Sequence, residues 1–309
     1  SGTVIRVDML GTSVRTFGGF GSQKKSLEKP GQFGTRHAPQ SQLGGFDVGH
    51  PGALGDSTDS VPDLFPLAVE GSPGLTRWVL QVDLEGLADM AHKHGVPLIV
   101  DNTVATPSLI KPIEWGADIV VDSLTKYMGG HGNSLGGVIV DGGEFPWAEH
   151  AEKFHMLTEP EDSYHGVVYT EAMGAAAYIG RVRTVALRNT GSALSPMNAF
   201  LILQGLQTLP LRMERHCDNA LAVANYLQDH PRVDWVNFAG LPDSRYYDLA
   251  KKYTGGKPSA LMTFGIKGGF DAGVKFYDAL NLFLRLVNIG DTKSLAAHPA
   301  STTHRQLSE

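Results

Sequence analysis

Two short apolar runs in the middle of the chain are each followed by side chains that could do chemistry. The run 97–101 ends in Asp101. Lys126 comes three residues after the run 117–123 and 25 residues after Asp101. One strand-to-strand crossover can span that distance, so neighbouring parallel strands would bring the two side chains to the same edge of a sheet. A primary amine held near a carboxylate can bind a carbonyl compound covalently and then act as a mobile base.

This combination meets the requirements of pyridoxal phosphate (PLP). The cofactor needs an amine for its aldehyde and a carboxylate for its pyridine nitrogen, and Lys126 and Asp101 supply these groups. Its phosphate needs hydroxyl and backbone N–H donors, of which Ser123 and Thr125 can supply a part, and a flexible glycine segment follows the lysine. The sequence therefore predicts a PLP site in which Lys126 is also the general base at the substrate α-carbon.

Other interpretations of the same segments are less consistent with their context. Taken singly, Asp101 could be a helix cap and Lys126 a solvated side chain. Gly130 and Gly132 lack the dinucleotide-binding spacing, and no phosphate-binding P-loop string occurs. Ser134 lies in a G-x-S-x-G string, but that string leads into a strand, whereas a nucleophile elbow opens a helix. No set of His, Cys, Asp and Glu has structural zinc spacing, so we expect no metal site.

The composition is that of a globular enzyme. The 309 residues carry 26 Lys and Arg against 32 Asp and Glu, a formal charge of −6, and 42% of them are hydrophobic. Mild acidity disfavours a nonspecific nucleic-acid partner, and the lack of an apolar run of about 18 residues disfavours a membrane span. With Cys217 as its one cysteine, the chain can form no internal disulfide, which favours the cytoplasm.

The elements around Asp101 and Lys126 alternate between helix and strand. The pattern predicts a helix over 83–95 and buried parallel strands at 97–101, 117–123 and 136–141. Leu84, Leu87, Ala88 and Ala91 would form the buried face of the helix, with Asp83 as N-cap and Gly95 just past its end. We therefore predict an α/β fold with a mostly parallel sheet built from crossover units.

The second half of the chain has a different pattern. Residues 195–229 read as a long helical region opened by Ser195 and Pro196 and kinked at Pro210. Strands are then expected at 233–237 and 260–266, followed by a helix over 272–284. These elements suit a smaller α+β domain that follows a linking helix.

The domain boundary is predicted between residues 207 and 208. A large PLP-binding domain would occupy residues 1–207, with an irregular or incomplete N-terminal part, because residues 17–75 are rich in Gly, Ser and Pro and have no sustained period. A smaller domain, which we expect to be truncated, would occupy residues 208–309.

Several segments resemble the Cys/Met-metabolism family of PLP-dependent enzymes and occur in the order of that family. They are 96–107 (VPLIVDNTVATP), 116–120 (GADIV) and 123–132 (SLTKYMGGHG). The tail 288–309 is most similar to the O-acetylhomoserine sulfhydrylase branch. The resemblance implies a fold-type I PLP enzyme, assembled as a homodimer or homotetramer.

The resemblance also implies roles for individual residues. Lys126 matches the lysine that binds the cofactor covalently, and Asp101 matches the partner of its pyridine nitrogen. Thr103 lies where a hydroxyl supports the region of the cofactor's ring oxygen, and Ser123 and Thr125 match hydroxyls on the phosphate side.

On the substrate side, Ser294 matches a residue that helps to hold the substrate carboxylate. The implied reaction of the sulfhydrylase branch replaces the acetate of O-acetylhomoserine by sulfide and gives homocysteine. Methionine γ-lyase or cystathionine γ-synthase activity is the first alternative, and a cofactor-poor oligomeric scaffold is the second. The chain departs from the family pattern at Asp122, where a histidine is usual, and residues 1–80 do not show the family's N-terminal motifs.

Overall fold

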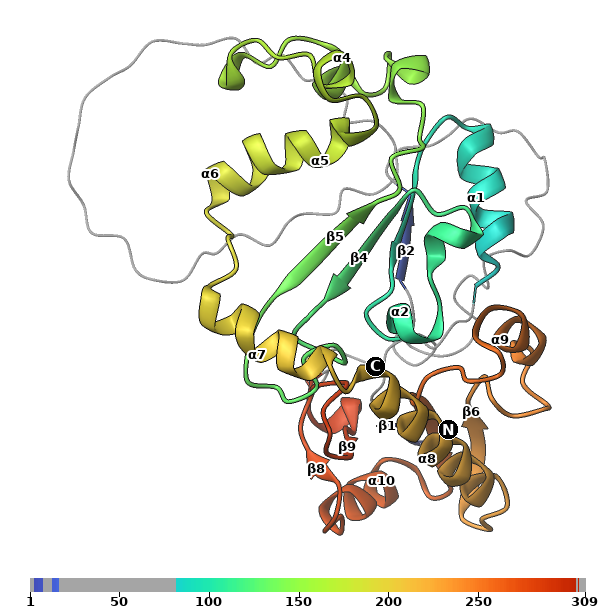
Figure 1. Ribbon diagram of the computed structural model, residues 1–309. Coiled ribbons are helices and arrows are strands. Elements are labelled where there is room, and N and C mark those ends of the chain that lie inside the picture. The colour runs from blue at the N-terminus through green and yellow to red at the C-terminus, as the bar shows by residue number, and fades with distance from the viewer. Residues whose placement is uncertain (1–2, 8–12, 17–81, 304, 306–309) are drawn as a thin grey trace, which may run out of the picture.

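The computed structural model of this chain describes residues 3–7, 13–16, 82–303 and 305. The prediction of an irregular segment over 17–75 lies outside the described residues. In the described part, helices pack on both faces of a mixed sheet, and a second, smaller sheet lies beyond one end of the first (Figure 1). The α/β fold class predicted from the sequence is confirmed.

The first sheet has the strand order β2-β3-β4-β5. Its strands are β2 (Ser13–Thr16), β3 (Leu98–Asp101), β4 (Ile119–Ser123) and β5 (Gly137–Asp141). β3 and β4 are parallel, with Val100 opposite Val120. They are the two strands that the sequence places before the candidate chemical residues.

The prediction of a third buried parallel strand was wrong. β5 runs antiparallel to β4, and Ile139 and Val140 on it are 40% and 44% exposed. The chain between the two strands forms turns and loops with no crossover helix, and only a crossover can return the chain to a parallel start. An apolar run of this length does not by itself reveal its direction.

One face of the sheet is covered by α1 (Leu84–Lys93), whose predicted buried face is confirmed. Leu84, Leu87, Ala88 and Ala91 pack with Leu98, Val100 and Val120, with α2 (Thr106–Leu109) and with the 3-10 turn η1 (Pro112–Trp115). Asp83 occupies the N-cap position, but its side chain makes no capping bond. Gly95 has the expected left-handed backbone, with φ of +57°.

The opposite face is covered by a series of short helices between residues 147 and 190 (Figure 1). Their core is aromatic: Phe145, Trp147 and Tyr169 pack around Ile119 of β4. The helices are η2 (Trp147–His150), α3 (His155–Thr158), η3 (Asp162–Tyr164), α4 (Tyr169–Met173), η4 (Gly174–Ala176), α5 (Ala177–Arg181), the π-helical η5 (Val182–Leu187) and α6 (Arg188–Thr190).

The predicted helical region 195–229 consists of two helices, α7 (Pro196–Leu206) and α8 (Leu209–Gln228). Ser195 caps α7 as expected, because its Oγ accepts a hydrogen bond of 3.2 Å from the backbone N–H of Asn198. The helix is interrupted between Leu206 and Leu209, so Pro210 lies in the first turn of α8, where its missing N–H costs no helical hydrogen bond. The proposed domain boundary at 207/208 falls in this break.

The second sheet has the order β1-β7-β6, all antiparallel, from β1 (Thr3–Val7), β7 (Met262–Ile266) and β6 (Val233–Asn237). Its core joins Phe238 and Phe264 to Ala220 and Ala224 of α8. The remaining elements are α9 (Tyr247–Thr254), α10 (Gly269–Asp278), β8 (Leu284–Arg285), β9 (Leu295–Ala296) and η6 (Pro299–Ser301).

Two details of this region differ from the sequence prediction. β1 comes from the first residues of the chain and yet belongs to the C-terminal sheet. α10 begins and ends earlier than the predicted 272–284, because Gly268 in the left-handed region (φ +105°) starts the helix early and the chain turns toward β8 after residue 280.

Candidate functional site

The carboxyl ends of β3 and β4 meet at one edge of the first sheet, as the parallel pairing requires. The backbone N–H of Ser123 donates a hydrogen bond of 2.8 Å to Thr103 Oγ1, which ties the two strand ends together. The N–H of Thr103 in turn donates to Asp101 Oδ1 at 3.0 Å and orients that carboxylate. The structure therefore brings Asp101, Thr103 and Ser123 to one edge, as the sequence predicts.

Lys126 follows β4 on a tight turn. Its N–H donates to the carbonyl of Ser123 at 3.2 Å, and its own carbonyl accepts from Gly130 N–H at 2.7 Å. Thr125 anchors the turn to the start of β5, because its hydroxyl exchanges hydrogen bonds with both backbone groups of Gly136, at 3.1 and 3.3 Å. The Lys126 side chain therefore extends from a turn that several hydrogen bonds hold in place.

The Lys126 side chain reaches a partner that sequence reasoning missed. Its Nζ donates a hydrogen bond of 2.7 Å to Asn288 Oδ1 in the C-terminal region. The segment around Asn288 lies directly on the lysine turn: the N–H of Thr292 donates to Gly130 O at 2.9 Å, and a Cβ on Gly290 would lie 2.4 Å from the backbone N of Tyr127. Asn288 lies six residues before Ser294 in the same tail. Its amide, which can accept a hydrogen bond, was the feature of the sequence that could have indicated this contact.

Ser294, predicted to bind the substrate carboxylate, is exposed. Its carbonyl accepts a bond of 2.9 Å from the N–H of Leu284 and so helps to pair β8 with β9. Within the described residues, the contact with Lys126 from this tail is made by Asn288. The role of Ser294 stays a prediction.

Asp122 adds a charge to this edge. Its side chain is 6% exposed, and its Oδ1 receives no hydrogen bond from the part of the chain that the structure describes. Burial, and secondarily the negative charge of Asp101, raises the pKa of Asp122 to about 6. A histidine, which is usual at this position in the family that the sequence resembles, would be neutral or positive there.

The donor set at this edge fits PLP. It contains an amine on a fixed turn, a carboxylate oriented by a backbone N–H, and hydroxyls of Ser123 and Thr103. The Thr125 hydroxyl already serves Gly136, which leaves it one acceptor position and no proton to donate to a phosphate. Thr125 therefore uses its hydroxyl proton within the fold, and the Thr103 hydroxyl also has a structural role, because its oxygen accepts from the N–H of Ser123.

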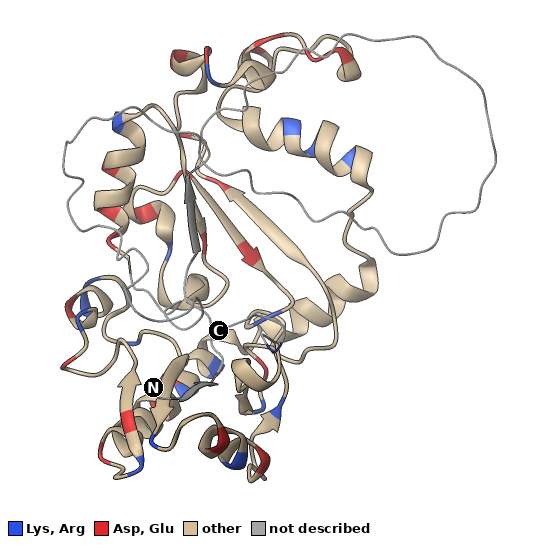
Figure 2. Ribbon diagram, turned by 180° about the vertical axis from the view of Figure 1, so that it is seen from behind, with Lys and Arg blue, Asp and Glu red and all other residues tan. Residues whose placement is uncertain are grey.

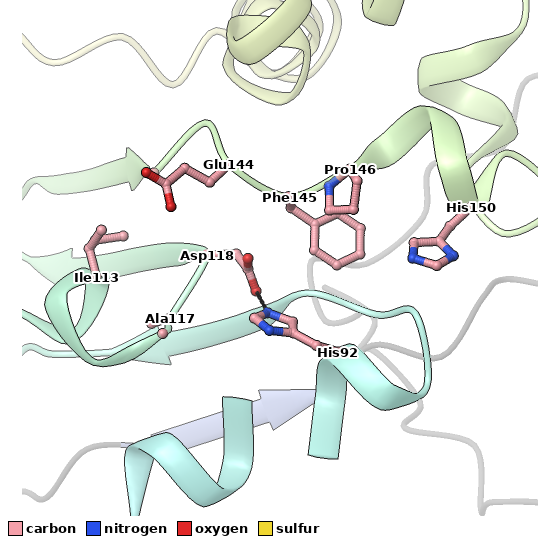
Figure 3. Close-up of a pocket in the computed structure, with 10 residues that line it drawn as sticks. His92, Ile113, Ala117, Asp118, Glu144, Phe145, Pro146 and His150 are labelled. Atoms are coloured by element: carbon pink, nitrogen blue, oxygen red, sulfur yellow. Dashed lines mark hydrogen bonds and ion pairs between the residues drawn. The ribbon is translucent and has the colours of Figure 1, made fainter. Parts of the chain in front are cut away.

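A separate cavity of about 320 Å³ lies at the other end of the sheet, where β4 begins (Figure 3). His92, Asp118, Glu144, Phe145 and His150 line it, and His92 Nε2 is 2.8 Å from Asp118 Oδ2. The backbone N–H of Leu98 also donates to that carboxylate oxygen, at 2.7 Å. Because Asp118 is already hydrogen-bonded to α1 and to β3, we interpret this cavity as a gap in the packing between α1 and the segment 144–150, which includes η2.

Three observations concern other partner classes. No three His, Cys, Asp or Glu side chains among the described residues are grouped so as to hold a metal ion. Across the same residues, no helix is both long and apolar enough to cross a bilayer. Acidic and basic segments are interspersed along the described ribbon (Figure 2).

Comparison with known proteins connects this geometry to a family. The family model described as Cys/Met metabolism PLP-dependent enzyme matches residues 75–309. The O-acetyl-L-homoserine sulfhydrylase of Leptospira meyeri is 51% identical over 235 residues, covering 73% of this chain and 53% of the relative. The O-acetyl-L-homoserine sulfhydrylase 1 of Thermus thermophilus is 50% identical over 227 residues, with 73% and 53% covered.

A solved structure has a similar fold. It is a putative O-acetylhomoserine (thiol)-lyase from Campylobacter jejuni that contains N'-pyridoxyl-lysine-5'-monophosphate, with 40% sequence identity and a TM-score of 0.69. The match covers 74% of this chain and 54% of that one. The chain thus spans about half the length of the relatives that it matches.

Proposed function

This chain belongs to the Cys/Met metabolism family of PLP-dependent enzymes, and from that premise we propose that it catalyses the replacement of acetate in O-acetyl-L-homoserine by sulfide, giving homocysteine for methionine biosynthesis. The observation that carries the proposal is the placement of Lys126 on the turn after β4, the strand that runs parallel to the one ending in Asp101, with its Nζ in contact with Asn288. Relatives named for this reaction share about half of their residues with the chain over the same region.

In this proposal Lys126 holds the cofactor covalently, Asp101 pairs with its pyridine nitrogen, and Ser123 contributes to its phosphate site. Thr103 positions the site, because its hydroxyl holds the end of β4 and its N–H holds Asp101. Thr125 acts through the turn that it anchors to Gly136. When bound, the cofactor withdraws electrons from the substrate's carbon chain.

Lys126 is also the proposed base. After the incoming amino acid displaces it, its Nζ takes a proton from the substrate Cα, gives that proton up, and then takes one from Cβ, which allows acetate to leave from Cγ. Once hydrogen sulfide has added at Cγ as its anion, protons return to Cβ and Cα by the same amine, and homocysteine results. Asn288 accepts a hydrogen bond from Nζ and so holds the amine between these transfers. Ser294 remains proposed as a contact for the substrate carboxylate.

The proposal is tested by the visible absorption spectrum of the protein with PLP, recorded before and after addition of O-acetylhomoserine. We expect a band that changes on substrate addition and that the Lys126→Ala variant never acquires. Supplying sulfide or cysteine as acceptor then separates sulfhydrylase from cystathionine γ-synthase activity. A wild-type chain that acquires no band in excess PLP would eliminate the catalytic function and favour the scaffold alternative.

We further propose a homodimer or homotetramer, with a large domain of residues 1–207 and a smaller one of 208–309. Met197, Phe200 and Leu203 support the assembly, because they lie along one side of α7 and are 66%, 56% and 60% exposed. Sedimentation of wild type against Phe200→Glu tests it, with a loss of mass expected in the variant. Cytoplasmic localisation is proposed from the use of one cysteine, Cys217, which is buried.

A further inference from the structure

The turn that carries Lys126 is held from outside by one side chain of α8. Arg212 Nη1 donates a hydrogen bond of 2.7 Å to the carbonyl of Tyr127, and its Nη2 donates one of 3.1 Å to the carbonyl of Met128. The same Nη2 also donates to Gly205 O of α7 at 2.8 Å. One guanidinium therefore joins the two residues after Lys126 to the helix that packs behind them.

The Arg212 guanidinium is itself fixed in place. Its Nε donates to Thr208 Oγ1, one helical turn earlier, at 3.1 Å. On the other side it lies against Gly130, where a Cβ would approach within 2.5 Å of Nη1. Partial burial lowers the pKa of Arg212, but an arginine keeps its charge at any pH at which the fold survives.

The next turn of α8 continues this contact. His216, four residues after Arg212, packs edge-on against the Tyr127 ring, with centroids 5.4 Å apart and planes at 88°. Burial and the neighbouring Arg212 lower the pKa of His216, so it packs as a neutral ring. α8 therefore contacts the lysine turn through both the backbone and the side chain of Tyr127.

An arginine suits this position because its planar fork can reach several carbonyl oxygens at once, whereas a lysine presents a single ammonium group. Losing the guanidinium would remove this donor from the buried Met128 carbonyl, whereas the Gly205 carbonyl would still accept from the N–H and the hydroxyl of Thr208. A buried acceptor that loses its donor is unfavourable. The turn would then settle in other conformations, and the direction in which Lys126 leaves it would no longer be unique.

We propose that Arg212 is a positioning residue for Lys126: by holding the carbonyls of Tyr127 and Met128, it fixes the turn from which Nζ reaches Asn288, and so sets how readily Lys126 reacts with the cofactor aldehyde. This inference rests on the proposed function, in which Lys126 is the lysine that binds PLP. Arg212 touches neither cofactor nor substrate in this role.

The test measures the reaction of Lys126 with PLP directly, without an activity assay. The 309-residue chain is mixed with PLP, quenched with borohydride at successive times, and digested, and the pyridoxyl label on each lysine is quantified by mass spectrometry. The quantity compared is the ratio of the initial rate at Lys126 to that at Lys275, an exposed lysine on α10. Loss of structure would bring the two rates together, so the ratio is compared only for variants that circular dichroism shows to be folded.

We expect Arg212→Met to lower this ratio by about tenfold or more, the factor that corresponds to one unsatisfied hydrogen bond. Arg212→Lys should retain an intermediate ratio, because its ammonium can reach one carbonyl. Arg215→Met is the matched control: Arg215 is exposed on the same helix, and we expect wild-type labelling.

A wild-type ratio in a folded Arg212→Met variant would overturn the inference. If that variant does not fold, as judged by circular dichroism, Arg212→Lys decides: a wild-type ratio there overturns the inference, and a reduced ratio supports it. Failure of the wild-type chain to label Lys126 selectively would instead refute the proposed function, so the two failures are distinguishable.

Discussion

Asp122 has a carboxyl group near the end of β4 and is 6% exposed, and Asn102, which follows β3, is 1% exposed. Within the described residues, neither Asp122 Oδ1 nor Asn102 Oδ1 receives a hydrogen bond. Two buried acceptors without donors are unfavourable, and a proton on Asp122 turns one of them into a donor. Asp122, which stands where a histidine is usual in the family, therefore destabilises the fold to a degree that depends on pH.

The pKa of Asp122 is raised from 3.8 to about 6 in the folded state. Between these values the folded state binds the proton and the unfolded state does not, so the free energy of unfolding falls as pH rises through this window. We expect Asp122→Asn to abolish that fall and to be more stable than wild type at pH 8 by on the order of 2–3 kcal/mol. Urea denaturation at pH 4 and pH 8 measures it.

The control for this measurement is Asp234→Asn, which changes an exposed carboxyl on β6 in the same way. Its stability should follow the wild-type curve throughout. Parallel pH curves for wild type and Asp122→Asn would show that Asp122 is not charged at a cost in the folded protein.

At the scale of elements, α7 lies unusually close to the lysine turn. A Cβ on Gly205 would lie 2.2 Å from Gly129 O and 2.7 Å from Met128 O. No side chain larger than hydrogen fits there without moving the helix. Gly205 therefore sets the distance between α7 and the turn that α7 and Arg212 together support.

This contact reverses the usual effect of a glycine replacement. In an exposed helix interior, Gly→Ala stabilises by about 1 kcal/mol, but we expect Gly205→Ala to destabilise by about 1–3 kcal/mol, because overpacking forces the backbone apart. Urea denaturation measures it, with Gln204→Ala, at an exposed position of the same helix, as the control. A stabilised Gly205→Ala variant would mean that α7 can move away from the turn freely.

At the scale of the whole molecule, α9 joins the C-terminal region to the first sheet. The Tyr253 ring packs edge-on against Trp115, with centroids 4.9 Å apart, and its hydroxyl donates to Asp83 Oδ1 at the start of α1. The hydroxyl of Ser259 also crosses this boundary and donates to Val104 O at 3.1 Å. Since Lys126 and Asn288 lie on opposite sides of the same boundary, the site depends on this docking.

Removing the Tyr253 side chain should weaken the docking of the two parts. We expect Tyr253→Ala to lower the free energy of unfolding by about 3–5 kcal/mol, the usual cost of deleting a buried aromatic ring. Tyr226→Ala, at a tyrosine of α8 that is 66% exposed, is the control. Hydrogen exchange should speed up in both α1 and α9 of the Tyr253 variant, and faster exchange in α9 alone would show that α1 does not depend on the contact.

Local sequence patterns were sufficient for much of the fold. The buried face of α1, the capping of α7 by Ser195 and the strands ending at Asp101 and Ser123 all follow from spacing within one element, because a helix or strand presents its side chains with a fixed period. The edge that joins Asp101 to Ser123 could be predicted as well, since parallel strands end on the same side of a sheet.

The direction of β5 and the long-range partners of the site could not be predicted from local patterns. The antiparallel course of β5 depends on how the chain turns after Lys126, and the pairing of β1 with β7 joins residues more than 250 positions apart. Asn288 and Arg212 reach the lysine turn from 162 and 84 or 85 residues away. Residue types and short spacings determined which chemistry this chain can hold, whereas the tertiary structure decided which side chains surround it, because such contacts form only when separate elements pack together.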